Sequence, residues 1–308
     1  MFQLGYGRYA IAAINVFTME QILGVFEAAH LASSPVILQT TPVARQYATP
    51  TLLLNMIEAA SQLFPEVVYG IHLDHGIESH IDSALERGGY TSVMIDASHD
   101  DLETNISRTR SIVQKAHALG IAVEAELGIL SGVEDDISIE ASQARYTQPK
   151  EVAYFVQQTG CDSLAIAIGT SHGAYKFKGD QGIQLEILRE IQATMPGYPL
   201  VLHGGSAVNP LEIERINASG GNMQVGSRGV DDSEIQAAIP LGICKINIAT
   251  DLRVLWARTH REFFKQQPEA FDPIIPGKKY REELVEFCIQ KFELFYSAGK
   301  STEYSSII

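Results

Sequence analysis

The sequence predicts a single α/β domain whose eight parallel strands close into a TIM (β/α)8 barrel. Short apolar runs alternate with helical segments along the 308 residues, the order expected when parallel strands are joined by helices. The apolar runs are continuous rather than alternating, as in strands that are covered on both faces. A doubly wound open sheet is disfavoured because no G-x-G-x-x-G motif follows the first apolar run.

The expected strands are short apolar runs bounded by polar residues, Gly or Pro, and they span residues 10–16, 35–39, 67–73, 92–95, 122–127, 163–167, 200–202 and 243–246. The expected helices lie between and after them, over residues 19–31, 51–63, 81–87, 102–119, 150–158, 185–195, 211–219 and 252–264. Two long connections, 128–148 and 220–232, are predicted to be functional lids or mobile surface. We interpret residues 1–308 as one domain, with a C-terminal extension from about 268 to 308 that contains a helix over 280–295.

Composition excludes several classes of protein. Hydrophobic residues make up 45% and charged residues 19% of the chain, typical of a globular enzyme. The net charge of −14 repels nucleic acid and anionic membranes, and no apolar run is long enough to cross a bilayer. Three widely spaced cysteines argue against a disulfide framework, and the first residues lack the pattern of a signal peptide. We therefore expect a cytoplasmic enzyme with no membrane or nucleic-acid partner.

Three histidines follow apolar runs: His75 in IHLDHG, His172 in AIAIGTSHGAYK and His203 in PLVLHGGS. Because the strands of a parallel barrel end at one common face, the three imidazoles are expected to converge there. Three imidazoles with an open coordination position are typical of a catalytic zinc site. Glycines after His172 and His203 allow a ligand to approach the backbone closely, which indicates an anion pocket beside the metal.

Ordered motifs at these strand ends resemble those of the class II, zinc-dependent ketose-bisphosphate aldolases, which include fructose-bisphosphate and tagatose-bisphosphate aldolases. The resemblance runs from about residue 7 to residue 299 and rests on HLDHG, SVMIDASH, VEAELG, AIGTSHGAYK, LVLHGGSAV and CKINIATDLR. It implies a lyase of carbohydrate metabolism. Such an enzyme cleaves a ketose 1,6-bisphosphate reversibly to dihydroxyacetone phosphate and glyceraldehyde 3-phosphate, through a zinc-stabilised enediolate.

The resemblance also assigns metal ligands. His75, His172 and His203 match the family's zinc ligands. Glu126 matches a carboxylate near the metal, and Asp96 matches a residue at an alternative metal position. For both carboxylates, hydrogen bonding to the ligand histidines remains the alternative to direct ligation. A monovalent cation, Na⁺ or K⁺, stays open as a second ion beside Zn²⁺.

Three residues match the family's acid–base groups. Asp74 matches the base that removes the proton from the C4 hydroxyl. Glu134 matches a mobile glutamate that moves protons at the enediolate carbon, although without the resemblance SGVEDD would be a solvated acidic turn. Asn247 matches an amide that contacts the enediolate, and its side-chain NH₂ is suited to a developing oxyanion.

The resemblance places the two phosphates as well. The residues that match the family's substrate- and phosphate-binding positions are Gly173, Gly204, Ser206, Thr250, Arg253 and Thr41. Backbone amides and hydroxyls near the metal suit a chain without a basic patch. Arg253 matches a cation for the distal phosphate, where a guanidinium fits the oxygens well. Lys245 is expected close by, within the barrel.

The sequence leaves the sugar open. Ala249 stands where many fructose enzymes carry an aspartate, and Thr41 with Pro42 is nearer the tagatose pattern, whereas the 220–232 insertion resembles fructose-cleaving members. We interpret the substrate as fructose 1,6-bisphosphate, with tagatose 1,6-bisphosphate or another ketose phosphate as the alternative. The resemblance also implies a homodimer or homotetramer.

Two rival mechanisms fit the sequence less well. A Schiff-base aldolase on the same barrel would use a lysine, and Lys245 is a candidate, but that mechanism gives no reason for three converging histidines. A zinc hydrolase of the amidohydrolase type would need a His-x-His pair after the first strand, where this chain reads INVFTME.

Overall fold

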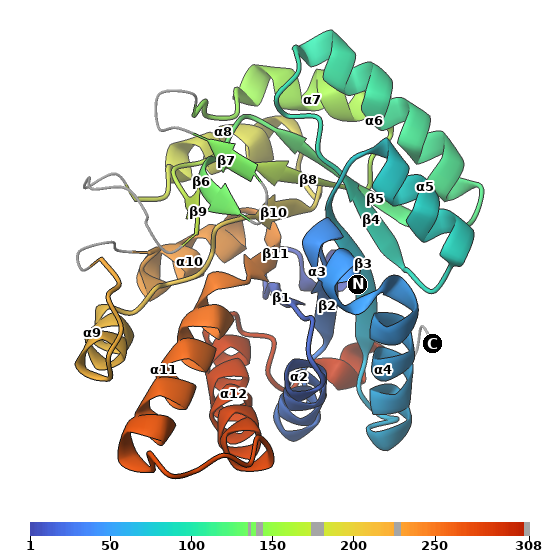
Figure 1. Cartoon of the computed structure of the whole chain (residues 1–308). Coiled ribbons are helices and arrows are strands. Elements are labelled where there is room, and N and C mark those ends of the chain that lie inside the picture. Colours follow the sequence, from blue (N-terminus) through green and yellow to red (C-terminus); the bar gives the residue numbers. More distant parts are fainter. Residues whose placement is uncertain (135–136, 140–143, 174–181, 225–228, 305–308) are drawn as a thin grey trace.

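Eight parallel strands form a closed barrel with helices around it, as the sequence predicts (Figure 1). The hydrogen-bonded order is β1-β11-β10-β8-β5-β4-β3-β2, so the last barrel strand closes onto the first. The computed structural model describes residues 1–134, 137–139, 144–173, 182–224 and 229–304. The side chains of residues 133, 134, 137–139 and 172 lie outside the described part.

The barrel strands are β1 (Ile11–Asn15), β2 (Val36–Thr40), β3 (Tyr69–Gly76), β4 (Ser92–Ile95), β5 (Ala122–Leu127), β8 (Ser163–Ile166), β10 (Leu200–Leu202) and β11 (Ile243–Ile248). The described helices are α1 (Phe2–Gly5), α2 (Met19–Ala32), α3 (Pro42–Ala48), α4 (Pro50–Leu63), α5 (Glu78–Arg87), α6 (Leu102–His117), α7 (Pro149–Thr159), α8 (Leu185–Thr194), α9 (Pro210–Ala218), α10 (Asp232–Ala238), α11 (Thr250–Gln266) and α12 (Ile274–Leu294), with short 3-10 turns η2 (Ile239–Leu241) and η3 (Ser301–Tyr304). β4, β5 and β10 have the bounds that the sequence predicts. α3 was not predicted, because its 7 residues are too few to show a helical period.

Local sequence sets where the helices begin. Thr18 caps α2 through a capping box, in which its hydroxyl accepts from the Gln21 N–H and the Gln21 side chain accepts from the Thr18 N–H. Asp101 caps α6 by accepting from the Thr104 N–H. Proline occupies the first turn of α4, α7 and α9, where its fixed φ suits a helix and its missing N–H costs nothing.

The long connection after β5 contains a hairpin. β6 (Ser131–Glu134) pairs antiparallel with β7 (Ile137–Ile139), and it pairs in parallel with β9 (Ser171–His172). In this register Gly132 lies opposite His172. β6 follows β5 and β9 follows β8, so the small sheet lies at the carboxyl end of the barrel strands (Figure 1). It ties the connection that carries Glu134 to the connection that carries His172.

The C-terminal helix α12 packs against α2 and covers β1 (Figure 1). Its side chains Leu284, Cys288 and Phe292 are buried in the main hydrophobic core. A Cβ atom at Gly24 of α2 would lie 3.0 Å from Leu284 Cδ2, so the two helices approach closely because residue 24 has no side chain. α12 therefore belongs to the packed shell of the barrel.

Aromatic and apolar side chains fill the amino-terminal end of the barrel. Tyr9, Ile11, Ile37 and Tyr304 form a buried cluster there. The Tyr9 and Tyr304 hydroxyls lie 2.9 Å apart, and Tyr304 donates to the Met1 carbonyl at 3.2 Å. Because this end is filled by packing, the polar inward-facing side chains are left to the other end, where barrel enzymes build their sites.

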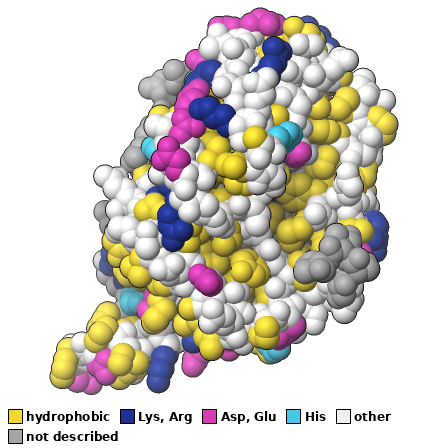
Figure 2. Space-filling view, turned by 90° about the vertical axis from the view of Figure 1, so that its right-hand side faces the viewer, with side chains coloured by type: hydrophobic (Ala, Val, Ile, Leu, Met, Phe, Trp, Pro, Cys, Tyr) yellow, Lys and Arg dark blue, Asp and Glu magenta, His cyan; other side chains and the backbone are white. Residues whose placement is uncertain are grey.

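The face of the molecule in Figure 2 mixes residue types. Lys and Arg side chains on this face lie apart and are interspersed with Asp, Glu and hydrophobic side chains. Among the side chains coloured there, no continuous basic surface is seen. Within the described ranges, no helix combines the length and apolar character needed to cross a membrane.

Candidate metal and active site

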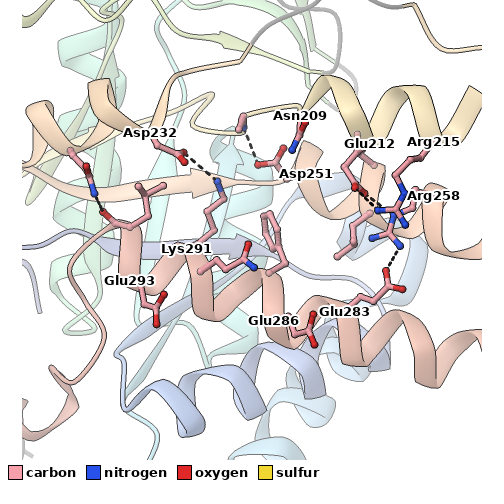
Figure 3. Close-up of a pocket in the computed structure, with 17 residues that line it drawn as sticks. Asn209, Glu212, Arg215, Asp232, Asp251, Arg258, Glu283, Glu286, Lys291 and Glu293 are labelled. Carbon is pink, nitrogen blue, oxygen red and sulfur yellow. Dashed lines mark hydrogen bonds and ion pairs between the residues drawn. The ribbon is translucent and has the colours of Figure 1, made fainter.

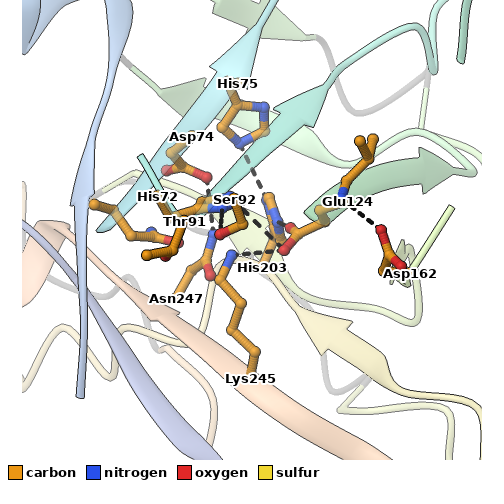
Figure 4. A network of polar contacts seen from close by, with 12 residues as sticks. His72, Asp74, His75, Thr91, Ser92, Glu124, Asp162, His203, Lys245 and Asn247 are labelled. Carbon is orange, nitrogen blue, oxygen red and sulfur yellow. Dashed lines mark hydrogen bonds and ion pairs between the residues drawn. The ribbon is translucent and has the colours of Figure 1, made fainter. Parts of the chain in front are cut away.

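Polar side chains converge inside the barrel near the carboxyl ends of β3, β5, β10 and β11 (Figure 4). Asp74, His203 and Asn247 are all buried there, with 5% or less of their surface exposed. The ligand atoms of Asp74, His75 and His203 lie within 4.8 Å of one another. The structure thus brings two of the three predicted zinc ligands and the predicted base together.

A bulge in β3 lets two consecutive residues face the site. In a regular strand Asp74 and His75 would point to opposite faces of the sheet. The register between β3 and β4 shifts between Leu73 and Gly76, and His75 has φ 50°, in the left-handed region. A Cβ at Gly76 would lie 2.9 Å from the Met94 carbonyl oxygen, so the DHG motif needs its glycine.

Two imidazoles face each other across the predicted metal position. His203 Nδ1 lies 3.1 Å from His75 Nε2. The outer nitrogen of each ring is held by a carboxylate. His75 Nδ1 lies 2.9 Å from Asp96 Oδ2. His203 Nε2 lies 2.9 Å from Glu124 Oε1 (Figure 4). Because a carboxylate accepts hydrogen bonds, the outer nitrogens donate to Asp96 and Glu124, which leaves the inner nitrogens as the atoms that would ligate a metal.

Burial and neighbouring charge set the protonation of these groups. Burial would raise the pKa of Glu124, but the Lys245 ammonium and the hydrogen bond from His203 hold that pKa well below its usual range. Burial would likewise raise the pKa of Asp96, but the hydrogen bond with His75 keeps the pKa well below its usual range. Burial lowers the pKa of His203. An ionised Glu124 beside a neutral His203 imidazole is the combination of states that metal binding requires.

Two amides clamp the Asp74 carboxylate. Asn15 donates to Asp74 Oδ2 at 3.2 Å, and Asn247 donates to Asp74 Oδ1 at 3.2 Å. The Gln39 side-chain amide donates to the side-chain oxygen Oδ1 of Asn15 at 2.7 Å and holds the Asn15 amide in place. The clamp draws residues from β1, β2, β3 and β11, so it exists only when the barrel is closed.

Glu126 and Asp96 lie beside His75. Ligand atoms of the three residues lie within 4.8 Å of one another. Asp96 accepts hydrogen bonds from the Ser98 backbone at 3.2 Å and the Ser98 hydroxyl at 2.8 Å. Asp96 therefore acts in this structure as a hydrogen-bonding partner of His75, and Glu126 is placed within reach of a metal held there.

The backbone next to His172 lies against the residue that follows His203, although the side chain of His172 is outside the described part. Gly204 has φ 65°, and a Cβ there would lie 2.5 Å from the Ser171 carbonyl oxygen. The residue after His203 is thus packed against the residue before His172. His172 follows β8, as the sequence predicts, and lies in the short strand β9 of the small sheet. The side chain of Glu134 also lies outside the described part, and its backbone pairs with Ile137.

Four of the six predicted substrate- and phosphate-binding residues, Gly204, Ser206, Thr250 and Arg253, lie on the segments after β10 and β11. Ser206 is buried, and its Oγ accepts from the Asp251 N–H at 3.4 Å. The Asp251 carboxylate accepts from the Ala207 and Val208 N–H groups at 2.9 and 2.8 Å. These contacts hold the loop after β10 against the start of α11, which carries Thr250 and the exposed Arg253.

The other two predicted residues lie elsewhere. Thr41 caps α3 by accepting from the Ala44 N–H at 3.2 Å, so its hydroxyl already has a structural role. Gly173 follows β9 with φ 81°, a conformation that glycine adopts without strain.

Several buried polar residues of the site escaped the sequence analysis. Glu124 and His72 face the barrel interior below the metal position, and Asn15 and Gln39 extend the polar layer to β1 and β2. Burial lowers the pKa of His72 well below its usual value, and the Lys245 charge adds to the effect. The sequence signal that could have identified Glu124 is the two-residue period of a strand, which places its side chain on the same face of β5 as Glu126.

A separate cavity of about 800 Å³ lies between α9, α10, α11 and α12 (Figure 3). Arg258 pairs there with Glu212 at 2.7 Å and with Glu283, and Lys291 lies 3.9 Å from Asp232. The residues that line it include none of the predicted site residues. These ion pairs join neighbouring helices. The carboxylates that line the cavity would repel a sugar bisphosphate, so this cavity is not the proposed substrate site.

Comparison with known proteins agrees with this geometry. Residues 4–300 match the family model described as fructose-bisphosphate aldolase class-II. The chain belongs to the class II fructose-bisphosphate aldolase family. It is 42% identical over 299 residues to a fructose-bisphosphate aldolase of Thermus caldophilus, with 95% of each chain covered. It is 41% identical over 306 residues to a fructose-bisphosphate aldolase of Giardia intestinalis, covering 97% of this chain and 92% of the relative.

A solved aldolase structure shows the same architecture. The YdjI aldolase of Escherichia coli K12 superimposes with a TM-score of 0.75 at 32% identity, over 95% of this chain and 93% of that one. Family membership confirms the resemblance found in the sequence motifs. The roles of individual residues follow from their geometry and are developed below.

Proposed function

We propose that the protein cleaves fructose 1,6-bisphosphate reversibly to dihydroxyacetone phosphate and glyceraldehyde 3-phosphate. The observation that carries the proposal is the clamped Asp74 carboxylate, which has a ligand oxygen within 4.8 Å of the ligand nitrogens of His75 and His203. A base beside a pair of imidazole lone pairs is the arrangement that a metal-assisted retro-aldol cleavage needs. The two curated relatives named above are fructose-bisphosphate aldolases, which favours fructose over tagatose.

Asp74 acts as the base. Retro-aldol cleavage begins when the C4 hydroxyl loses its proton, and the electrons of the C3–C4 bond then flow toward the C2 carbonyl to give an enediolate. The amide donors of Asn15 and Asn247 orient the carboxylate and leave it acceptor capacity for that proton. Asn247 also places an uncharged donor where negative charge develops on the substrate.

The donor set fits a divalent metal, and we propose Zn²⁺. His75 Nε2 and His203 Nδ1 converge with their outer nitrogens already engaged, and His172 would be the third ligand. Glu126 and Asp96 stand beside His75. When bound, the ion would polarise the substrate carbonyl as a Lewis acid.

The loop after β10 and the start of α11 would bind the phosphates. Backbone amides at Gly173 and Gly204, with the Ser206 hydroxyl, would receive the phosphate nearer the metal. Thr250 and the exposed Arg253 would receive the distal one. Local donors of this kind are needed because the chain as a whole carries a net charge of −14.

The contacts of Lys245 weigh against a Schiff-base mechanism. Its Nζ is buried and donates to Glu124 Oε2 at 2.8 Å. An ammonium group that is paired with a buried carboxylate is not a nucleophile, since a Schiff-base lysine must be neutral and must reach the substrate carbonyl.

Replacing His75 or His203 with Ala is expected to remove bound zinc and nearly all aldolase activity, because each change deletes one ligand nitrogen. Zinc per chain is measured by elemental analysis and folding by circular dichroism. His260→Ala, on the outer face of α11, is the control and should keep both metal and activity. A His203→Ala protein that retains stoichiometric zinc would show that the ion, if any, binds elsewhere.

Asp74→Ala is expected to lower kcat by about 10²–10⁴-fold, the usual effect of losing a general base, with a smaller change in KM. The measurement is steady-state cleavage of fructose 1,6-bisphosphate by zinc-loaded protein. Asp82→Ala, which removes an exposed carboxylate from α5, serves as the control and should leave kcat unchanged. An increase in KM alone would mean that Asp74 binds substrate and that another group is the base.

Ala249→Asp is expected to raise the fructose-to-tagatose ratio of kcat/KM by about tenfold, the equivalent of one added hydrogen bond. Ala249 precedes α11, beside the proposed phosphate loop, and its methyl group offers no donor or acceptor to a sugar hydroxyl. Both bisphosphates are assayed side by side, with Ala249→Leu as a control for added bulk. A wild-type protein that is already strongly selective for fructose would place the determinant outside Ala249.

We further propose a homo-oligomer, supported by exposed apolar side chains on α11, on the connection to α12 and at the start of α12. Trp256, Phe264, Phe271 and Ile274 are 50, 43, 93 and 60% exposed, and exposed apolar surface of this kind marks protein contacts. Sedimentation velocity should show a dimer or tetramer. Trp256→Glu combined with Phe264→Glu should shift it toward monomer, and a monomeric wild type would contradict the proposal.

A further inference from the structure

A line of buried charged and polar groups runs beneath the proposed metal position. Lys245 Nζ donates to Glu124 Oε2 at 2.8 Å, and Glu124 Oε1 lies 2.9 Å from His203 Nε2 (Figure 4). All three residues are 2% exposed or less. They come from β11, β5 and the end of β10, so the line crosses the interior of the barrel.

Each Glu124 oxygen has a different partner. Oε1 accepts from His203, and Oε2 accepts from Lys245. His72 Nε2 is 3.8 Å from Oε2, too far for a hydrogen bond. In the described part of the chain, Lys245 is therefore the residue that orients the carboxylate so that its other oxygen meets His203.

The hydrogen bond between Glu124 and His203 determines which ring nitrogen of His203 can ligate a metal. Because Glu124 is an acceptor, the proton of the imidazole resides on Nε2, and the lone pair resides on Nδ1. Nδ1 is the atom that faces His75, at 3.1 Å. The opposite tautomer would direct an N–H toward the metal position and would abolish ligation.

The same arrangement occurs on His75 with a different support. Asp96 holds the outer nitrogen of His75, and Asp96 is itself held by the backbone and hydroxyl of Ser98, two residues along the same loop. Glu124 has no such local support among the described contacts. Its orientation depends on Lys245, which lies 121 residues away in the sequence.

We propose that Glu124 and Lys245 are positioning residues of the metal centre: Glu124 sets the tautomer and ring orientation of His203, and Lys245 holds Glu124 in the position to do so. The inference rests on the metal centre proposed above and extends it to residues that touch neither metal nor substrate. Partners of this kind alter metal affinity by about 10–100-fold when they are removed.

If the Glu124–Lys245 pair only filled the barrel interior, replacing it with apolar residues should leave metal affinity unchanged. Replacing both members of a buried ion pair with apolar residues of similar volume is often neutral or stabilising. The apolar double variant, Glu124→Leu with Lys245→Met, therefore keeps the interior filled while it removes the acceptor for His203. The double variant therefore separates the effect of core packing from the effect of positioning His203. A single substitution would not separate them, because it would leave one buried charge without a partner.

The experiment measures Co²⁺ binding to the full-length metal-free protein by competition with a chromophoric chelator, together with the visible absorption of bound Co²⁺ and the melting temperature. The apolar double variant should melt at or above the wild-type temperature and bind Co²⁺ about 10–100-fold more weakly. Glu124→Gln with Lys245→Met should recover only part of the affinity, because the amide oxygen can still accept from His203 but no longer has the Lys245 ammonium to orient it.

Met94→Leu is the matched control, since Met94 is buried and lies in register with Glu124 on β4. It should bind Co²⁺ like the wild type. The positioning role is overturned if the apolar double variant binds Co²⁺ as tightly as the wild type with an unchanged absorption spectrum, or if Met94→Leu weakens binding equally. A wild-type protein that binds no Co²⁺ would instead overturn the metal centre itself, and with it this proposal.

Discussion

The site depends on one constraint: polar groups sealed inside a closed barrel must find partners there. A buried ion without a partner costs several kcal/mol, so each interior charge has to be matched by a group on a neighbouring or facing strand. Lys245, Glu124 and His203 satisfy one another across the interior, and Asn15 and Asn247 satisfy Asp74. The same contacts that make the buried charges tolerable also orient the groups proposed to bind the metal and to act as the base.

Backbone strain in β3 also helps to orient the side chains of the site. His75 adopts a left-handed conformation at a bulge in β3, which turns both Asp74 and His75 toward the interior. The proposed base and a proposed metal ligand, on adjacent residues, are thus brought to one side of the strand. The cost is offset by the hydrogen bonds that both side chains make there, and Gly76 provides the room for the β3–β4 contact.

Connections outside the barrel adapt this scaffold to a particular reaction. The β6–β7 hairpin pairs with β9, so the segment of Glu134 and the segment of His172 form one small sheet rather than two independent loops. Asp251 joins the loop after β10 to the start of α11 in the same way. The barrel supplies rigid positions for the interior groups, while these joined connections carry the residues proposed to surround the substrate.

The sequence by itself determined the order of the elements, the barrel and the family, because apolar runs, helix caps and strand-end motifs are local signals that need no partner. It also predicts a site containing Asp74, His75, His203, Asp96 and Glu126, and ligand atoms of these residues lie within 4.8 Å of one another in two groups that share His75. Only the tertiary structure decided that Glu124 supports His203, that the region after β5 forms a hairpin with β9, and that α12 packs into the shell against α2. These features depend on contacts between distant segments, and a side chain's role there is set by which group the closed barrel places opposite it.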